Sequence, residues 1–126
     1  MTSLLFDTDV IIEILRGNAN VIERIRTLTE SAHHIACSCI TIGEIFAGMK
    51  PHEEIATRKL LNGLVKIQVT EKIAEMAGDL KRITRSHTLW LDDCLIAATA
   101  IITNSTLVTK NSKHYPFKQL AVLKID

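Results

Sequence analysis

Four side chains with oxygen donors lie close to the ends of predicted strands or the starts of predicted helices. They are Asp7, Glu44, Asp93 and Asn111. Carboxylates that are held together repel one another strongly unless a cation lies among them. Oxygen ligands of this kind suit Mg²⁺ or Mn²⁺, which keep several waters and bind substrate phosphates. If these residues converge, they favour a reaction at a phosphate that is assisted by a cation.

Several of the acids also have a purely structural explanation. The segment from Thr41 to Glu44 fits a capping box, in which the Glu44 side chain returns to the N–H of Thr41. Taken alone, this pattern favours a cap over catalysis at Glu44. Asp9 and Asp92 are likewise better explained as helix caps than as ligands. Asp7 is different, because an acid that ends an apolar strand has no standard capping role.

Strands and helices alternate along the chain. Short apolar runs predict strands, and apolar residues at helical spacing predict the helices between them. The predicted strands are residues 3–6, 35–40, 64–69, 106–109 and 120–125. The predicted helices are residues 10–15, 21–28, 41–48, 52–61, 70–86 and 94–102. The alternation predicts an α/β fold with a mainly parallel central sheet flanked by helices, whose site lies at the carboxyl ends of the strands.

The last predicted helix, residues 94–102, is apolar apart from Thr99 and carries no charge. Its alanines favour a helix and let other backbones approach closely. A helix that is apolar nearly all round is buried, since a surface helix shows a polar stripe. Asp92 and Asp93 therefore fall at the first turn of a buried helix, where one acid can cap it and the other is left for chemistry.

Length and composition limit the class of protein. A chain of 126 residues is expected to form one domain with a proper core. Its hydrophobic fraction is 47% and its aromatic fraction only 4%, so the apolar mass is aliphatic and part of it is expected in an interface. The net charge of +1 indicates no particular partner, so any nucleic-acid role depends on local patches.

The chain is expected in the cytoplasm, without a membrane segment. No apolar run approaches the length of a membrane span, and Asp7 and Asp9 interrupt the region where a signal peptide would be apolar. The three cysteines agree, because an odd number fits no disulfide framework. Cys37 and Cys39 are expected on one face of a strand with Cys94 remote from them, a spacing that does not suit zinc.

Four segments, in order, resemble the sequence blocks of PIN-domain nucleases. Residues 4–12 (LLFDTDVII) resemble the family's opening, a hydrophobic strand followed by Asp-x-Asn or Asp-x-Asp. Residues 41–48 (TIGEIFAG) resemble the block whose Glu is catalytic, and residues 93–100 (DCLIAATA) the block with Asp before an apolar run. Residues 107–111 (LVTKN) resemble the fourth block, where many members carry Asp and others Asn. In its length, with no further domain, the chain most resembles the toxin ribonucleases of VapBC toxin–antitoxin pairs.

The resemblance implies a three-layer PIN-like nuclease domain over residues 1–126. Its activity would be that of a Mg²⁺- or Mn²⁺-dependent endoribonuclease that hydrolyses RNA phosphodiester bonds. Carried over position by position, Asp7, Glu44 and Asp93 would be catalytic residues and metal ligands. Asn111 would be a further metal-site residue, with one negative charge fewer than in members that carry four acids.

The resemblance also implies partners. RNA, in single-stranded or looped form, would need cationic contacts around an acidic pocket. The candidates are Arg16, Lys110, Lys113, Arg82 and Arg85. A solvated helix face is the commoner role for such residues. The other implied partners are a second copy of the chain, forming a homodimer, and a small antitoxin that covers the rim of the active site.

Three alternatives remain open at the level of sequence. Asp7 and Asp9 after an apolar strand also resemble the nucleophile and acid of haloacid-dehalogenase phosphatases, although the chain is short for that fold. Asp7, Asp9, Thr109 and Lys110 faintly resemble a phospho-receiver, which would make the chain a non-enzymatic interaction module. A metal-free ribonuclease would use paired histidines, and the spacing of the five histidines singles out no pair.

Overall fold

Five parallel strands form the centre of the protein. The computed structural model describes residues 2–85 and 89–125. The strands are β1 (Thr2–Phe6), β2 (Ala32–Ser38), β3 (Val65–Ile67), β4 (Thr106–Thr109) and β5 (Val122–Lys124). They lie in the order β3-β2-β1-β4-β5, and every neighbouring pair is parallel. The predicted fold class is confirmed.

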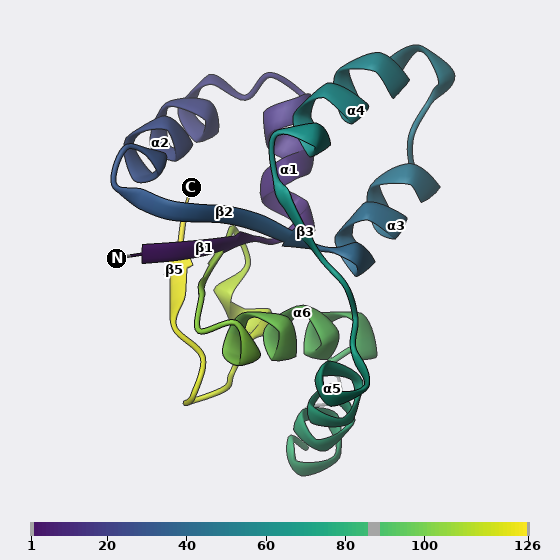
Figure 1. Cartoon of the computed structure of the whole chain (residues 1–126), viewed down its shortest axis with the longest axis vertical. Helices are drawn as coiled ribbons and strands as arrows, with labels where there is room; N and C mark the ends of the chain where they lie inside the picture. Colours follow the sequence, from purple (N-terminus) through teal and green to yellow (C-terminus); the bar gives the residue numbers. More distant parts are fainter. Residues whose placement is uncertain (1, 86–88, 126) are drawn as a thin grey trace.

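Helices cover both faces of the sheet. They are α1 (Thr8–Leu15), α2 (Ala19–Thr29), α3 (Cys39–Ala47), α4 (Glu54–Asn62), α5 (Glu71–Ile83) and α6 (Leu91–Ile102), with 3₁₀ turns η1 (Pro51–Glu53) and η2 (Ser112–His114). In Figure 1, α1, α2 and α4 lie above the strands, while α5 and α6 lie below them. The molecule therefore has three layers.

The alternation of side chains along each strand builds two cores. Leu4 and Phe6 of β1 pack among the helices on one face, whereas Leu5 packs with α5 and α6 on the other. Leu5 is paired with Ala36 of β2 and Leu107 of β4, and all three belong to the same core. Strands that are buried on both faces read as continuous apolar runs, and this explains the sequence pattern.

Helix α6 lies deep in one of these cores. Cys94, Ile96, Ala97, Ala98, Thr99 and Ala100 are all buried. The predicted buried helix is confirmed, and the small side chains suit its packing against α5 and the sheet. The helix begins at Leu91, so Asp92 and Asp93 lie within its first turn.

The helix caps differ from those predicted. Helix α1 is capped by Asp7, and Asp9 is its second residue. Helix α3 begins at Cys39 because the Ser38 side chain accepts the Ile40 N–H at 3.1 Å, so the capping box predicted at Thr41 is wrong. The N-cap of α6 is Trp90 rather than Asp92.

Several element boundaries also differ. Because β2 ends at Ser38, Cys37 and Cys39 do not share a strand face, although both cysteines are free as expected. The strands predicted at 64–69 and 120–125 are shorter, and the helix predicted at 52–61 is divided between η1 and α4. Helix α5 ends at Ile83, and the end predicted for it at residue 86 lies outside the described residues.

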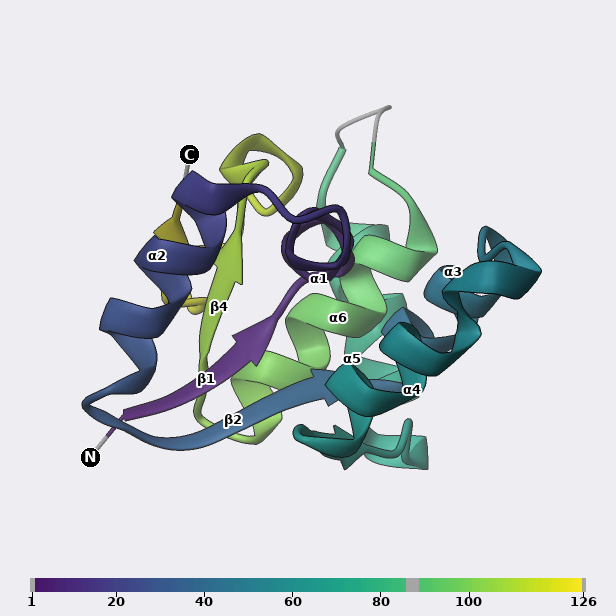
Figure 2. The ribbon, with the colours of Figure 1, turned by 90° about the horizontal axis from the view of Figure 1, so that it is seen from above.

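The chain reverses at the end of α1 through Gly17, whose φ of +76° is a conformation that glycine adopts without strain. Figure 2 shows β1 and β2 pointing toward the helices α1 and α3 that follow them. The first turns of these helices therefore meet at the carboxyl edge of the sheet.

Within residues 2–85 and 89–125, none of the helices is long and apolar enough to cross a membrane.

Candidate active site

Asp7 lies at the carboxyl end of β1 and is 7% exposed. Its Oδ1 accepts the Thr8 N–H at 2.8 Å, which fixes the start of α1. Its Oδ2 accepts the Thr109 hydroxyl at 2.8 Å and the Tyr115 hydroxyl at 2.9 Å. The Asp7 N–H donates to the carbonyl oxygen of Val108 at 2.9 Å, so strand pairing brings these groups together. The carboxylate is thus held in one orientation from several directions.

Glu44 reaches the same region from the second turn of α3. The Thr8 hydroxyl donates to Glu44 Oε1 at 2.7 Å and lies 3.0 Å from the Thr41 hydroxyl. Burial raises the pKa of Glu44 above its ordinary value, and the charges of Asp92, Asp7 and Asp93 raise it further, against the lowering effect of the Thr8 hydrogen bond. Glu44 is therefore a member of the acid cluster and not a helix cap.

Asp93 enters the cluster from the first turn of α6. Hydrogen bonding to the backbone of Trp90, the cap of the same helix, is among the influences that lower its pKa. Burial raises the pKa of Asp93, the neighbouring His114 lowers it, and the charge of Asp7 raises it again. The charges of Asp7 and Asp93 also raise the pKa of Glu44, which indicates that the three carboxylates lie near enough for their charges to interact.

Asn111 is directed to Asp9 rather than to the three carboxylates. Asp9 Oδ2 accepts the Asn111 side-chain N–H at 3.2 Å and the Lys110 backbone N–H at 3.1 Å. Asp9 Oδ1 is buried, and among the described residues it finds no hydrogen-bond partner. Burial, followed by the charge of Asp7, raises the pKa of Asp9 to about 6. Asp9 therefore lies beside the cluster as a second acidic group.

The donor set suits a cation that keeps its waters. Among the residues that the structure describes, no group of three or more Asp, Glu, His or Cys side chains is arranged to hold a metal ion directly. Mg²⁺ does not require such a cage, because it is usually bound through one or two carboxylates, several waters and a substrate phosphate. Carboxylates whose pKa values are raised by burial and by one another are stabilised by such an ion. The site therefore fits hydrated Mg²⁺ or Mn²⁺.

The predicted cationic residues fall into two groups. Arg16 and Lys110 line a pocket with Asp9 and Asn111, and both lie close to Glu13, at 3.6 Å and 3.1 Å. The remaining three, Lys113, Arg82 and Arg85, are exposed, and Arg82 is paired with Asp79 at 2.8 Å. The first group therefore borders Asp9 and Asn111, beside the acid cluster, and Arg16 also lines a pocket with Glu44.

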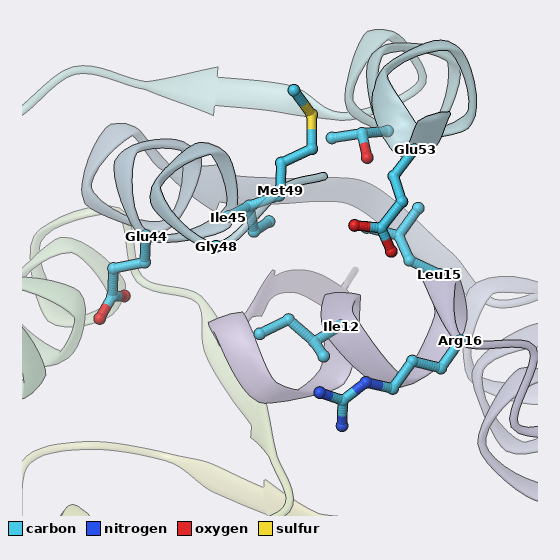
Figure 3. Close-up of a pocket in the computed structure, with 9 residues that line it drawn as sticks. Ile12, Leu15, Arg16, Glu44, Ile45, Gly48, Met49 and Glu53 are labelled. Atoms are coloured by element: carbon cyan, nitrogen blue, oxygen red, sulfur yellow. The ribbon is translucent and has the colours of Figure 1, made fainter. Parts of the chain in front are cut away.

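A second pocket, of about 180 Å³, opens on the other side of Glu44. Its wall is formed by α1, α3 and the start of α4, with Ile12 and Met49 among its apolar residues. In Figure 3 the Glu44 side chain points away from Met49 and Glu53, while the Arg16 side chain extends back toward Ile12. Glu44 therefore lies between the acid cluster and this mixed pocket, which Arg16 and Glu53 also line.

Sequence reasoning missed the hydroxyl groups around Asp7. Thr8 lies between a predicted strand and a predicted helix, and Thr109 ends a predicted strand and is a candidate only in the phospho-receiver alternative. Their places at the ends of two neighbouring parallel strands are the signal that could have connected them with Asp7. Tyr115 lies 108 positions from Asp7 and follows η2. Its hydroxyl is buried on the acid cluster, and burial and the charge of Asp7 raise its pKa far above the ordinary value. No local pattern marks this residue.

The protein is a three-layer α/β domain with a cluster of acids at the carboxyl edge of its sheet. Comparison with family models identifies the family to which this domain belongs. The PIN-domain family model matches residues 4–123, so the chain belongs to the PIN-domain family. This finding removes the phosphatase and receiver alternatives, and it confirms the resemblance seen in the four sequence blocks.

Within that family, the chain is similar to proteins of the VapC group. It is 35% identical over 114 residues to Ribonuclease VapC19 of Mycobacterium tuberculosis, a match that covers 89% of this chain and 91% of the relative. It is 36% identical over 120 residues to Ribonuclease VapC10 of the same organism, covering 93% and 90%. A chain of a toxin–antitoxin complex from Klebsiella pneumoniae superposes with a TM-score of 0.79 at 29% identity, covering 98% and 100%.

Proposed function

We propose that this protein is an endoribonuclease and the toxin of a toxin–antitoxin pair, with residues 1–126 working as one PIN-like nuclease domain. The observation that carries the proposal is the set of three neighbouring carboxylates, Asp7, Glu44 and Asp93, at the carboxyl edge of a PIN-domain sheet. The similarity of this chain to two ribonucleases, over about nine-tenths of its length, supports RNA as the substrate.

Asp7, Glu44 and Asp93 would hold Mg²⁺ or Mn²⁺. The Asn111 amide oxygen is the further donor, since its N–H₂ group already donates to Asp9. When bound, such an ion polarises the scissile phosphate and lowers the pKa of a water. Several waters would complete the coordination, because the carboxylates of the described residues do not form a closed cage.

The chemistry proposed is hydrolysis of a phosphodiester bond. A water oxygen forms a bond to phosphorus, and the bond between phosphorus and the leaving ribose oxygen breaks. The water's proton needs an acceptor, and a carboxylate whose pKa is raised toward neutrality is a good one. Glu44 or Asp93 would take this role where it does not contact the cation, and the hydrogen bond from Thr8 keeps Glu44 oriented.

The phosphates on either side of the scissile bond need positive charge. Arg16 and Lys110 are the first candidates, because they line a pocket that also contains Asp9 and Asn111. Both are close to Glu13, which an RNA phosphate would have to replace as their partner. Lys113, Arg82 and Arg85 are exposed and would contact more distant phosphates.

A small VapB-like antitoxin and a second copy of the chain are the proposed protein partners. Structural similarity to a chain of a toxin–antitoxin complex supports the first. The pocket between α1, α3 and α4 lies beside Glu44, so a protein seated there would cover the rim of the active site. Large apolar side chains that remain exposed support the second. The cytoplasm, where RNA and free cysteines are both expected, is the proposed location.

Metal dependence is the direct test of this function. Purified protein should cleave single-stranded RNA in Mg²⁺ or Mn²⁺, stop when EDTA is added, and recover when excess cation is restored. The expected result follows because the clustered carboxylates repel phosphate unless a cation neutralises them. Cleavage that continues undiminished in chelator would contradict the carboxylate mechanism and favour the histidine mechanism instead. Asp93→Asn serves as the inactive control, since it removes one charge from the cluster.

A further inference from the structure

Asp7 receives more hydrogen bonds than its place at the start of a helix requires. The Thr8 N–H donates to Oδ1 at 2.8 Å, and this bond alone satisfies the N-cap. The Thr109 and Tyr115 hydroxyls both donate to Oδ2, at 2.8 Å and 2.9 Å. These two hydroxyls come from β4 and from the end of η2, so their convergence on one oxygen calls for another explanation.

The number of lone pairs on the carboxylate gives that explanation. An ionised carboxylate offers about four lone-pair sites, two on each oxygen. Thr109 and Tyr115 fill both sites on Oδ2, and the Thr8 N–H fills one on Oδ1. One site is therefore left, and it is on Oδ1.

Burial makes this arrangement persistent. Asp7 is 7% exposed, Tyr115 is 4% exposed and Thr109 is fully buried. The Tyr115 ring packs in the same core as Phe117 and Leu120, so the position of its hydroxyl is set by apolar packing. Replacing a buried donor by water would need space that close packing does not leave.

We propose that Tyr115, together with Thr109, restricts Asp7 to binding a cation through Oδ1 alone, and that Tyr115 is thereby a positioning residue that favours Mg²⁺ over Ca²⁺. The proposal rests on the metal-dependent function proposed above. Mg²⁺ requires near-octahedral coordination, whereas Ca²⁺ accepts more ligands and binds carboxylates through both oxygens. A carboxylate whose Oδ2 is occupied by two hydroxyls cannot offer the second oxygen.

Tyr115→Phe tests this proposal, because it keeps the packed ring and removes only the hydroxyl. Binding of Mg²⁺ and of Ca²⁺ to chelator-treated protein without RNA is measured by isothermal titration calorimetry. We expect the ratio of Ca²⁺ to Mg²⁺ affinity to rise by about threefold to tenfold in the variant, the range that one hydrogen bond supports. An unchanged ratio, including an equal change in both affinities, would overturn the proposal.

A matched pair at the other donor keeps the test decisive if Tyr115→Phe does not fold. Thr109→Val removes the second hydroxyl from Oδ2 and should shift the ratio in the same direction, while Thr109→Ser keeps the hydroxyl and should keep the wild-type ratio. Thermal unfolding in EDTA checks that each variant is folded. Wild-type protein that binds neither cation would refute the proposed function and this inference together. Wild-type binding with an unchanged ratio in the variants refutes this inference alone.

Discussion

At the scale of single residues, the acids were predictable and their partners were not. Asp7 and Asp93 stand out in the sequence because an acid next to an apolar run has few structural uses. The donors that orient Asp7 lie more than 100 positions away along the chain, at Thr109 and Tyr115. Only the pairing of β1 with β4 brings them within hydrogen-bond distance. Local sequence patterns do not predict such long-range contacts.

Asp9 and Asp7 are expected to respond differently to the same substitution. Asp9→Asn keeps an oxygen that can accept the Lys110 N–H. It also removes a negative charge that the neighbouring Asp7 carboxylate repels. Metal-dependent RNA cleavage by Asp9→Asn should therefore stay within about tenfold of wild type, because the lost charge is not a proposed ligand. Asp7→Asn should lower cleavage by about 100-fold or more, the scale typical for loss of a catalytic group. Single-turnover cleavage in Mg²⁺ measures both.

Two controls accompany this pair of variants. Thermal unfolding in EDTA should show both proteins folded, since Asn at position 7 is about as good a helix cap as Asp and Asp9 is only partly buried. Loss of cleavage in folded Asp9→Asn, equal to that in Asp7→Asn, would mean that Asp9 takes part in the chemistry. The role of the buried Asp9 Oδ1 would then need to be assigned anew.

At the scale of elements, the order and type of the strands and helices followed from periodicity, whereas the caps did not. Local pattern favours Thr41 as the N-cap of α3, because Glu44 follows it at capping-box spacing. The fold instead uses Ser38, which starts the helix earlier. Thr41 and Glu44 then lie inside the helix, where both face Thr8 of α1. These contacts between α1 and α3 join residues 33 and 36 positions apart, and local pattern does not contain them.

Ser38→Ala should weaken the protein and its active site together. Loss of this cap is expected to lower the free energy of unfolding by about 1 kcal/mol. Glu44 lies on the helix that Ser38 starts, so a frayed first turn should also displace Glu44 from Thr8 and reduce cleavage. Urea denaturation measures the first effect, and RNA cleavage at a temperature well below unfolding measures the second.

Thr70→Ala is the matched control for that variant. Thr70 caps α5 by accepting the Ile73 N–H at 3.2 Å, on a helix that supplies none of the three proposed catalytic acids. It should lose a similar free energy of unfolding and keep its cleavage rate. If the two variants lose cleavage in equal measure, the effect of Ser38 is one of general stability and Glu44 does not depend on the cap.

At the scale of the whole molecule, the sequence predicted the layers but not the order of the strands. Both cores follow from strands that are apolar on two faces, and the parallel arrangement follows from the helices between them. The placement of β1 between β2 and β4 depends on long-range pairing, and it is this placement that brings Glu44, Asp93 and Thr109 to Asp7. The carboxyl ends of parallel strands predicted a shared edge for these side chains, and the strand order explains which strands bring them there.

The expected homodimer also belongs to this scale. Several large apolar side chains remain exposed, and three of them lie at the junction of α5 and α6: Ile83 at 61%, Trp90 at 73% and Leu91 at 47%. Lys81 Nζ donates to the Leu89 carbonyl oxygen at 2.8 Å, which holds the end of α5 beside the start of α6. A cluster of exposed apolar side chains marks an interaction surface more strongly than an isolated one.

Ile83→Glu should therefore shift the protein toward a monomer. Wild-type protein at micromolar concentration should have a mass above the 14.0 kDa of one chain, and a charge at Ile83 should reduce it toward that value because an unpaired carboxylate is costly to bury. Ile55→Glu is the control, since Ile55 is 85% exposed on α4 and apart from the α5–α6 junction. Light scattering coupled to gel filtration measures both masses. A wild-type monomer would contradict the predicted dimer, and dissociation by Ile55→Glu and not by Ile83→Glu would place the dimer surface away from the junction of α5 and α6.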